Sequence, residues 1–414
     1  MGDRIYGLIG ETLKHSWSVP IHRELGCSTY RLYELTPDRL GSFLTQQDIG
    51  GLNVTIPYKK AVIPYCTRID PLAKEIGSVN TLVTDSSGSL CGYNTDAAGF
   101  SYLARRAGIS FSGANVLILG TGGTSLTART VASHEGASRI VVVSRSGPVN
   151  YENVYNESET DIVVNTTPVG MYPHSGEKLL DLRRFPNLKC VLDVIYNPNR
   201  TALLAQAEEL GCPCSDGLPM LVAQAVEAER IFTGRPIPDS EVERITGLLR
   251  TQTSNIVLIG MPGSGKTTVG LALSEKTGRK AIDLDELIET EAGMTIPEIF
   301  ETEGESGFRA RETKAATEAG KESGVIIMAG GGIVTRAENY YPLRQNGILF
   351  QLDRALDLLP KNGRPLSLKT DLKEMAARRA PMYEAFRDEL IDNNGTVDAT
   401  VDTIWEDYLE HTRT

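Results

Sequence analysis

The sequence predicts an α/β protein with parallel sheets, and three stretches indicate this class. Two are apolar strands that run into glycine-rich turns, at residues 115–125 and 255–267, each followed by a helix-compatible segment. Such strand–turn–helix units bind nucleotide phosphates. The third is residues 4–97, where polar side chains gather at the ends of short strands. Because ligands bind at that edge of an open α/β sheet, we expect a small-molecule site beside two nucleotide sites.

The composition is that of a globular protein with several compact units: 414 residues, 41% apolar and 23% charged. A net charge of −11 without a basic stripe argues against a nucleic-acid or anionic-membrane partner. Six cysteines without CxxC pairs and five scattered histidines argue against zinc or disulfides and favour reduced thiols. No run of 18 apolar residues and no secretory leader are evident. We therefore expect a cytoplasmic protein acting on small molecules, and a homodimer remains open.

The turn at 260–267 has the full phosphate-binding pattern, GMPGSGKT. Its backbone N–H groups can cradle phosphates, while Lys266 reaches the terminal ones and the Thr267 hydroxyl holds Mg²⁺. A chance glycine turn is the alternative, and the strand before it and the helix after it argue against that. The expected nucleotide-binding residues are Gly260, Gly263, Ser264, Gly265, Lys266, Thr267 and Thr268.

Polar residues converge at the strand ends of the first 97 residues. Ser16 and Ser18 follow the first strand, although serines in such a loop also commonly cap a helix. Asn53, Thr55 and Lys59 surround a strand end that Pro57 terminates; Asn80 closes a later strand, and Asp96 adds a carboxylate after a third. We expect these groups to line one ligand site.

These segments resemble the shikimate dehydrogenase family over nearly all of residues 4–245. The matching motifs are HSWS (15–18), NVTIPYK (53–59), GSVNT (77–81), GYNTD (92–96), NTTPVGM (165–171) and DGLPMLVAQA (216–225). The resemblance implies a substrate-binding domain made of residues 1–97 and 217–245, and a Rossmann-like NADP-binding domain at 98–216. It also implies that the substrate is bound by Ser16, Ser18, Asn53, Thr55, Asn80, Asp96, Tyr196 and Gln224.

By the same resemblance, Lys59 and Asp96 form the catalytic pair. Reduction of a ring ketone by hydride generates an alkoxide, so a proton donor must stand within hydrogen-bond reach. A lysine held beside a carboxylate is suited to that role. The alternative is that Lys59 is an ordinary surface lysine, although the neighbouring Lys60 could be the exposed one instead.

The turn after residues 115–119 carries a dinucleotide pattern in which Ser125 replaces the third glycine. Only 15 residues separate the next strand from the one that follows, so we expect a reduced helix or a loop there. Ser144 and Arg145 stand where an NAD site places an acid, which favours NADPH; a solvated Arg145 is the alternative. The expected cofactor residues are Gly120, Gly122, Gly123, Ser144, Arg145, Gly217 and Met220.

Residues 233–254 contain glycine, two prolines and a short helical turn. We expect a linker at 246–254 without an apolar period, and hence two halves that fold independently.

Residues 255 to about 410 resemble shikimate kinase, which implies a P-loop domain of the nucleoside-monophosphate-kinase type at 255–414. Alternation predicts that Asp283 and Asp285 share one face of an extended segment. The resemblance implies that Asp283 binds Mg²⁺ and that Asp285 binds a substrate hydroxyl and assists its deprotonation. The alternative is that both are exposed acids in a turn. Arg309 and Arg379 would grip the carboxylate. Gly331 and Gly332 would let the backbone approach the substrate ring.

The lid departs from the kinase family. The segment from Asp353 to Arg364 is short, and the additional arginine expected upstream of Arg364 is absent or replaced by Lys361. Arg364 itself would bind ATP and stabilise the charge of the transferring phosphate as a catalytic residue. Whether the short lid weakens nucleotide binding stays open.

The sequence thus indicates one chain that reduces 3-dehydroshikimate with NADPH and then phosphorylates shikimate with ATP and Mg²⁺. Three alternatives remain: a quinate or broader polyol dehydrogenase, another small-molecule P-loop kinase such as one acting on gluconate, and a nucleotide-regulated scaffold.

Overall fold

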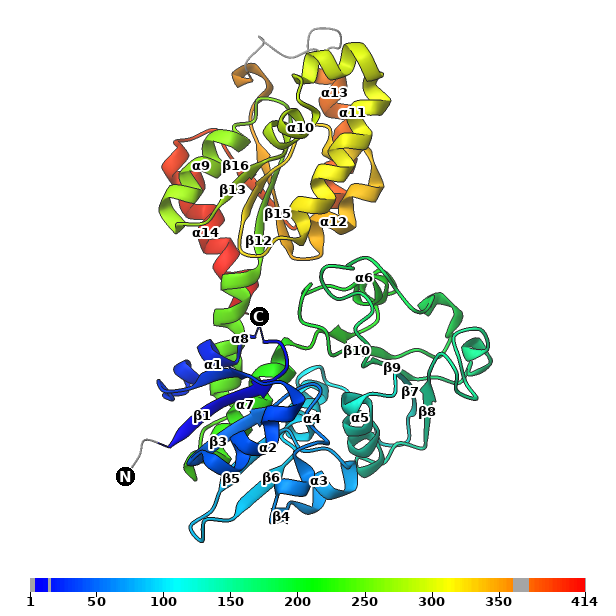
Figure 1. Ribbon diagram of the computed structural model, residues 1–414. Helices are drawn as coiled ribbons and strands as arrows, with labels where there is room; N and C mark the ends of the chain where they lie inside the picture. Colours follow the sequence, from blue (N-terminus) through cyan, green and yellow to red (C-terminus); the bar gives the residue numbers. More distant parts are fainter. Residues whose placement is uncertain (1–3, 14–15, 360–371, 414) are drawn as a thin grey trace. The chain divides into compact units, whose positions relative to one another are not determined.

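The computed structural model describes residues 4–13, 16–359 and 372–413. The chain divides into two compact units (Figure 1). The first unit comprises residues 1–169, 178–196 and 206–246, and the second comprises residues 170–177, 197–205 and 247–414.

The first unit opens with a mixed sheet of six strands in the order β2-β1-β3-β5-β6-β4. β3 pairs in parallel with β1 and antiparallel with β5. The strands are β1 (Ile5–Gly10), β2 (Arg31–Glu34), β3 (Ile49–Val54), β4 (Arg68–Ile69), β5 (Thr81–Thr84) and β6 (Leu90–Tyr93). The helices of this stretch are α1 (Ser18–Glu24), α2 (Pro37–Gln46), α3 (Pro71–Ile76) and α4 (Asp96–Arg106).

A second sheet in the same unit has five parallel strands in the order β11-β10-β9-β7-β8. They are β7 (Asn115–Leu119), β8 (Arg139–Val143), β9 (Ile162–Asn165), β10 (Cys190–Asp193) and β11 (Cys214–Ser215). α5 (Gly123–His134) follows β7, and α6 (Ala202–Glu209) and α7 (Leu218–Thr233) come later in the chain. The predicted strand–turn–helix unit is confirmed. So is the shortened crossover, which holds only a 3-10 turn at Val154–Asn156.

The second unit is built on a parallel sheet in the order β13-β14-β12-β15-β16. The strands are β12 (Asn255–Ile259), β13 (Ala281–Asp283), β14 (Ile326–Met328), β15 (Gly347–Asp353) and β16 (Glu389–Asp392). The helices are α9 (Lys266–Thr277), α10 (Leu284–Ala292), α11 (Ile296–Lys321), α12 (Tyr340–Arg344), α13 (Leu372–Phe386) and α14 (Val397–Arg413).

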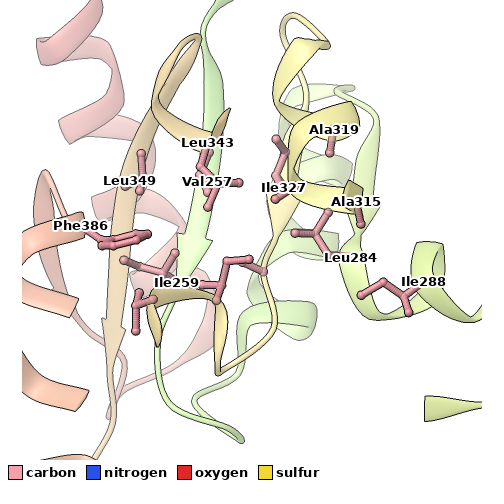
Figure 2. Close-up of a cluster of buried hydrophobic side chains, with 14 of the residues drawn as sticks. Val257, Ile259, Leu284, Ile288, Ala315, Ala319, Ile327, Leu343, Leu349 and Phe386 are labelled. Carbon is pink, nitrogen blue, oxygen red and sulfur yellow. The ribbon is translucent and has the colours of Figure 1, made fainter. Parts of the chain in front are cut away.

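Both faces of this sheet are buried, which explains why its strands are continuously apolar. Val257, Ile327 and Leu349 pack on one face with Ala315 and Ala319 of α11, as Figure 2 shows. Residues such as Ile256 and Leu258 pack on the other face against α9 and α14. The core holds the carboxyl ends of the strands in place, where the phosphate loop begins.

The expected linker is instead part of a helix, α8 (Ser240–Thr253). For the whole stretch 233–254, the expectation of no apolar period was wrong, because Val242, Ile245 and Leu249 are all buried. Their spacing of three and four residues forms one helical face, which the flanking glycine and prolines obscured. In the first unit, Arg106 donates a hydrogen bond to the Glu243 carboxylate of α8. In the second unit, the hydroxyls of Thr251 on α8 and Thr412 hydrogen-bond at 2.7 Å.

One expected strand end was also wrong. Residues 77–80 do not end a strand; they follow helix α3, which Asp70 caps and Gly77 closes in a left-handed conformation (φ 69°). Asn80 stands just before β5. Because β5 runs antiparallel to β3, its beginning still meets the end of β3, with Asn53 opposite Thr81. The polar groups therefore still converge, because the end of β3 pairs with the start of the antiparallel strand β5.

No helix in the described part of the chain is long and apolar enough to cross a membrane.

Candidate active sites

The centre of the first unit is an ion pair between Lys59 and Asp96. Lys59 Nζ lies 2.6 Å from Asp96 Oδ2, and the two side chains are 19% and 12% exposed. Lys59 follows β3, and Asp96 is the first residue of α4. The neighbouring Lys60 is the exposed lysine, so the surface interpretation does not apply to Lys59. The pair is half-buried yet open to a ligand, as proton transfer requires.

Asn80 joins this pair to the sheet edge. Its Nδ2 donates to Asp96 Oδ1 at 2.9 Å, and its Oδ1 accepts the Thr95 backbone N–H at 2.7 Å. Asn53 lies in the same network, since its Nδ2 donates to Thr81 Oγ1 at 3.3 Å. The structure thus brings Asn53, Lys59, Asn80 and Asp96 together, as the sequence predicted, although these contacts alone do not assign roles.

The other predicted substrate residues lie around this network with fewer contacts. Ser16 Oγ donates to Ser18 Oγ at 3.1 Å and accepts the Ser18 backbone N–H at 3.2 Å. Although the N-cap position of α1 is Trp17, Ser16 therefore satisfies the first N–H of this helix. Gln224 on α7 accepts from Thr95 Oγ1 at 3.5 Å. Thr55 follows β3 directly, and its backbone N–H donates to Ile9. Tyr196 follows β10, and burial raises the pKa of its hydroxyl; the described contacts do not join it to the Lys59 network.

The glycine turn after β7 approaches the catalytic pair. A Cβ added to Gly123 would lie 3.9 Å from Lys59 Cδ, whereas one added to Gly122 would meet nothing within 4 Å. Gly120 has φ 104°, a left-handed conformation that only glycine adopts freely. The open space above Gly122, at the start of α5, fits the phosphates of a dinucleotide. The hydride donor would then stand beside the proton donor.

Two further cofactor residues lie where α7 begins. Gly217 packs so closely on β10 that a Cβ would fall 2.0 Å from the Val194 carbonyl oxygen. Met220 is buried, and its carbonyl lies against Gly99 of α4. Close backbone packing therefore explains both glycines, and it fixes the start of α7 relative to β10.

Arg145 follows β8 and is exposed, with Ser144 half-buried before it. The Ser144 N–H donates to the Val149 carbonyl at 3.2 Å, which closes a tight turn around Gly147. Burial raises the pKa of the Tyr151 hydroxyl, and the positive charge of Arg145 opposes that rise. Arg145 and Tyr151 thus share the short crossover, and Arg145 has freedom to meet an anionic ligand.

The phosphate loop of the second unit has the geometry its sequence implies. Gly263 and Gly265 have φ 86° and 96°, and α9 starts at Lys266. Lys266 Nζ donates to the carbonyls of Gly260 and Met261 at 2.9 and 3.1 Å. Ser264 is fully buried, while Thr267 and Thr268 are exposed at the helix start. Backbone N–H groups and one ammonium therefore face the same concave loop.

Thr267 and Asp283, the two residues predicted to hold a magnesium ion, are in contact. Thr267 Oγ1 donates to Asp283 Oδ2 at 2.9 Å. No cluster of three or more His, Cys, Asp or Glu side chains suited to a metal occurs in the described residues. Mg²⁺ is commonly held by one or two protein groups plus substrate phosphates, so this pair fits the ion.

The expectation that Asp283 and Asp285 share a face of an extended segment was wrong. β13 ends at Asp283, and Asp285 lies in the first turn of α10. The reason is a helix cap: Asp283 Oδ1 accepts the Asp285 backbone N–H at 2.9 Å. Asp285 instead faces Gly330, where a Cβ would lie 3.0 Å from its Oδ1.

Two buried arginines meet at the glycines that follow β14. Arg379 Nη1 donates to the Gly331 carbonyl at 2.7 Å. Arg309 packs against Gly332 so closely that a Cβ there would lie 2.2 Å from its Nη1. Burial lowers the pKa of Arg379 and leaves its charge in need of a partner. Two guanidinium groups side by side suit a carboxylate.

Arg364 and Lys361 lie outside the described residues, as does His15 of the first motif. Their expected roles stay predictions.

Comparison with known proteins agrees with this geometry in both units. Residues 8–82 match the family described as shikimate dehydrogenase substrate binding domain, and residues 217–245 match the shikimate 5'-dehydrogenase C-terminal domain. Over 263 residues the chain is 34% identical to "Shikimate dehydrogenase (NADP(+))" of Clostridium perfringens, covering 58% of this chain and 97% of that protein. The chain belongs to the shikimate dehydrogenase family. Residues 262–409 match the shikimate kinase family, so this dehydrogenase carries a shikimate kinase domain.

Solved structures resemble the dehydrogenase part. A chorismate mutase/shikimate 5-dehydrogenase fusion protein from Clostridium acetobutylicum is 33% identical with a TM-score of 0.57, covering 60% of this chain and 98% of that one. Quinate dehydrogenase from Corynebacterium glutamicum is 28% identical with a TM-score of 0.54, covering 58% and 96%.

Three residues of the kinase domain were missed by the sequence analysis. Glu312, fully buried, accepts from Arg309 Nη1 at 2.7 Å and shares the space at Gly330 with Asp285; burial raises its pKa. Asn393 after β16 donates to the Ser264 carbonyl at 2.6 Å. Arg354 after β15 would lie 3.6 Å from a Cβ added to Gly265.

Of these three residues, only Glu312 could have been found from the sequence. It lies three residues after Arg309, and residues three apart share a helix face. Asn393 and Arg354 reach the phosphate loop from strands that follow it by about 90 to 130 residues in the chain. No local pattern could have linked them to Gly265.

Proposed function

We propose that this chain is a bifunctional enzyme: it reduces 3-dehydroshikimate to shikimate with NADPH, and it phosphorylates shikimate to shikimate 3-phosphate with ATP and Mg²⁺. The observation that carries the first activity is the Lys59–Asp96 pair beside the glycine turn of α5. The second rests on the phosphate loop and the arginine pair at Gly331 and Gly332.

In the reduction, NADPH supplies the hydride to the ring carbonyl carbon. Lys59 would donate a proton to the carbonyl oxygen as negative charge develops there. Asp96 holds the ammonium group in place and keeps it oriented, because Asp96 Oδ1 is itself fixed by Asn80. Ser16, Ser18, Asn53, Thr55, Asn80, Tyr196 and Gln224 would bind the hydroxyls and carboxylate of the substrate.

In the phosphorylation, Asp285 would hold the reacting hydroxyl of shikimate and assist its deprotonation. Arg309 and Arg379 would bind the carboxylate, with Glu312 holding Arg309 at the correct place. Lys266 and Arg364 would neutralise charge on the transferring phosphate, while Thr267 and Asp283 bind Mg²⁺. Phosphoryl transfer depends chiefly on such positioning and charge neutralisation.

We assign the dehydrogenase substrate domain to residues 1–97 and 217–245, the NADP domain to 98–216 and the kinase to 255–414. Residues 246–254, which include the last part of helix α8, join the two halves. Arg145 and Ser144 support NADPH, since no acid stands between Val141 and Tyr151 to accept from a ribose hydroxyl. The six cysteines are free thiols, which supports a reducing cytoplasm. The partners would be the small-molecule substrates, without nucleic acid or membrane, and a homodimer is one assembly to test.

The proposal is tested by incubating the purified chain with 3-dehydroshikimate, NADPH, ATP and Mg²⁺. We expect NADPH to be consumed and shikimate 3-phosphate to form, with shikimate accumulating when ATP is left out. Quinate and gluconate serve as competing substrates. Turnover of quinate but not shikimate, or phosphorylation of gluconate but not shikimate, would show that the substrate assignment is wrong, and no turnover at all would favour a scaffold.

A further inference from the structure

Tyr30 lies behind the proposed substrate residues of the dehydrogenase. It is 3% exposed, and its hydroxyl donates to Asn53 Oδ1 at 2.7 Å. The Ser18 side chain also hydrogen-bonds to this hydroxyl. Asn53 is itself only 4% exposed. One phenol group thus contacts two residues that we assign to the substrate, although the motifs in the sequence do not include Tyr30.

The hydrogen bond from Tyr30 closes a one-way chain that begins at the catalytic carboxylate. Asp96 can only accept, so Asn80 must offer Nδ2 to it, at 2.9 Å. Asn80 Oδ1 then accepts from Thr81 Oγ1 at 3.1 Å, and Thr81 Oγ1 accepts from Asn53 Nδ2 at 3.3 Å. This sequence leaves Asn53 Oδ1 for Tyr30.

The consequence is a fixed amide orientation. With Oδ1 taken by Tyr30 and one N–H of Nδ2 taken by Thr81, Asn53 has one N–H left. It can therefore donate this N–H to an oxygen of a ligand. Without the Tyr30 hydroxyl, only the hydrogen bond to Thr81 Oγ1 would orient the Asn53 amide, and Thr81 Oγ1 has a further partner in Thr95 Oγ1 at 3.0 Å.

Stacking against His22 holds the Tyr30 ring in place. The two ring centroids lie 3.8 Å apart, and the ring planes are 6° apart. His22 is fully buried, and its Nδ1 lies 3.5 Å from Oε2 of the buried Glu229, on the same helix as Gln224. Burial, and then the charge of Glu229, raises the pKa of the Tyr30 hydroxyl, so the phenol keeps the proton that it donates.

We propose that Tyr30 is a positioning residue of the dehydrogenase: its hydroxyl fixes the Asn53 amide so that Asn53 presents an N–H to an oxygen of the polyhydroxylated substrate. This inference rests on the proposed assignment of Asn53 to the substrate site. Tyr30 acts through Asn53 and touches no reacting atom.

The test compares Tyr30→Phe with a matched control, Tyr58→Phe. Tyr58 is equally buried (2% exposed), and its hydroxyl donates to the Leu35 carbonyl, away from Asn53. Both changes delete one buried phenol hydroxyl, so a purely structural effect should be similar in the two. We expect Tyr30→Phe to raise KM for shikimate about tenfold with kcat and KM for NADP⁺ little changed, and Tyr58→Phe to leave KM unchanged.

A double-mutant cycle with Asn53→Ala separates the positioning role of Tyr30 from the substrate-binding role of Asn53. If Tyr30 acts through Asn53, adding Tyr30→Phe to Asn53→Ala should raise KM no further. Additive effects on KM, or equal effects of Tyr30→Phe and Tyr58→Phe, would overturn the positioning role alone. An unchanged KM in Asn53→Ala would instead remove Asn53 from the substrate site, and the inference about Tyr30 would fall with it.

Discussion

Lys59 and Asp96 form an ion pair of 2.6 Å between residues that stand 37 positions apart in the chain. Since Asp96 holds the ammonium group, Asp96→Asn should weaken its orientation and lower kcat for reduction about 100-fold or more, within the usual range for acid–base groups. Steady-state kinetics of 3-dehydroshikimate reduction, followed by NADPH consumption, measure this. Asp85→Asn is the control, because Asp85 accepts from Ser87 and Ser89 on an exposed turn. Equal losses in both variants would contradict the role of Asp96.

Arg145 provides the prediction on cofactor choice. Because it is exposed beside the short crossover, it is available to a 2′-phosphate, and such a charge-assisted bond contributes about 1.5–3 kcal/mol. Arg145→Ala should therefore raise KM for NADP⁺ by roughly tenfold or more and leave that for NAD⁺ nearly unchanged. Arg183→Ala, which removes another exposed arginine paired with Asp181, is the control. Equal use of both cofactors by the unmodified chain would show that Arg145 does not select.

Arg354 provides a prediction for the kinase. Its guanidinium lies next to Gly265, and in the described residues its buried Nε has no hydrogen-bond partner. We expect it to contact the bound nucleotide from the end of β15. Arg354→Ala should raise KM for ATP about tenfold, with KM for shikimate unchanged.

The control for that change is Arg336→Ala, because Arg336 pairs with the side chain of Glu338, which is exposed. An unchanged KM for ATP in Arg354→Ala would remove Arg354 from the nucleotide site.

Helix α8 changes where the kinase should be cut. The carbonyls of Thr251 and Ser254 accept from the Tyr408 hydroxyl at 2.9 and 2.8 Å, and Arg279 donates to both carbonyls as well. A fragment of residues 255–414 loses these bonds, whereas residues 247–414 keep them. The Tyr408 hydroxyl and two Arg279 N–H groups lose their carbonyl acceptors. At about 1 kcal/mol for each of these donors, and about 2–4 °C per kcal/mol for a domain of this size, the shorter fragment should melt roughly 6–12 °C lower. Thermal unfolding of both fragments measures this, and equal melting temperatures would contradict it.

Local patterns predicted the parts of the fold that local chemistry decides. The glycine turns after β7 and β12 each demand strand before and helix after, and both are present. The geometry around Asp283 was not predictable by alternation, because one cap bond to Asp285 converts an extended segment into a helix start.

Contacts between distant parts of the chain escaped the sequence altogether. Tyr30, just before β2, meets Asn53 of β3, and Arg354, just after β15, meets Gly265, only because the strand order of each sheet brings these positions together. Helix α8 was missed for a different reason. Its apolar residues number only a few among charged and threonine residues, so the period at Val242, Ile245 and Leu249 is short.

One chain is proposed to carry two independent chemistries, with Lys59 serving reduction and Lys266 serving phosphorylation. The most direct measurement follows NADPH consumption and shikimate 3-phosphate formation in Lys59→Ala and Lys266→Ala, with circular dichroism to verify that both fold. Lys59→Ala should lose reduction and keep phosphorylation of added shikimate, and Lys266→Ala should do the reverse. Loss of both activities from either single change in a folded protein would contradict the account.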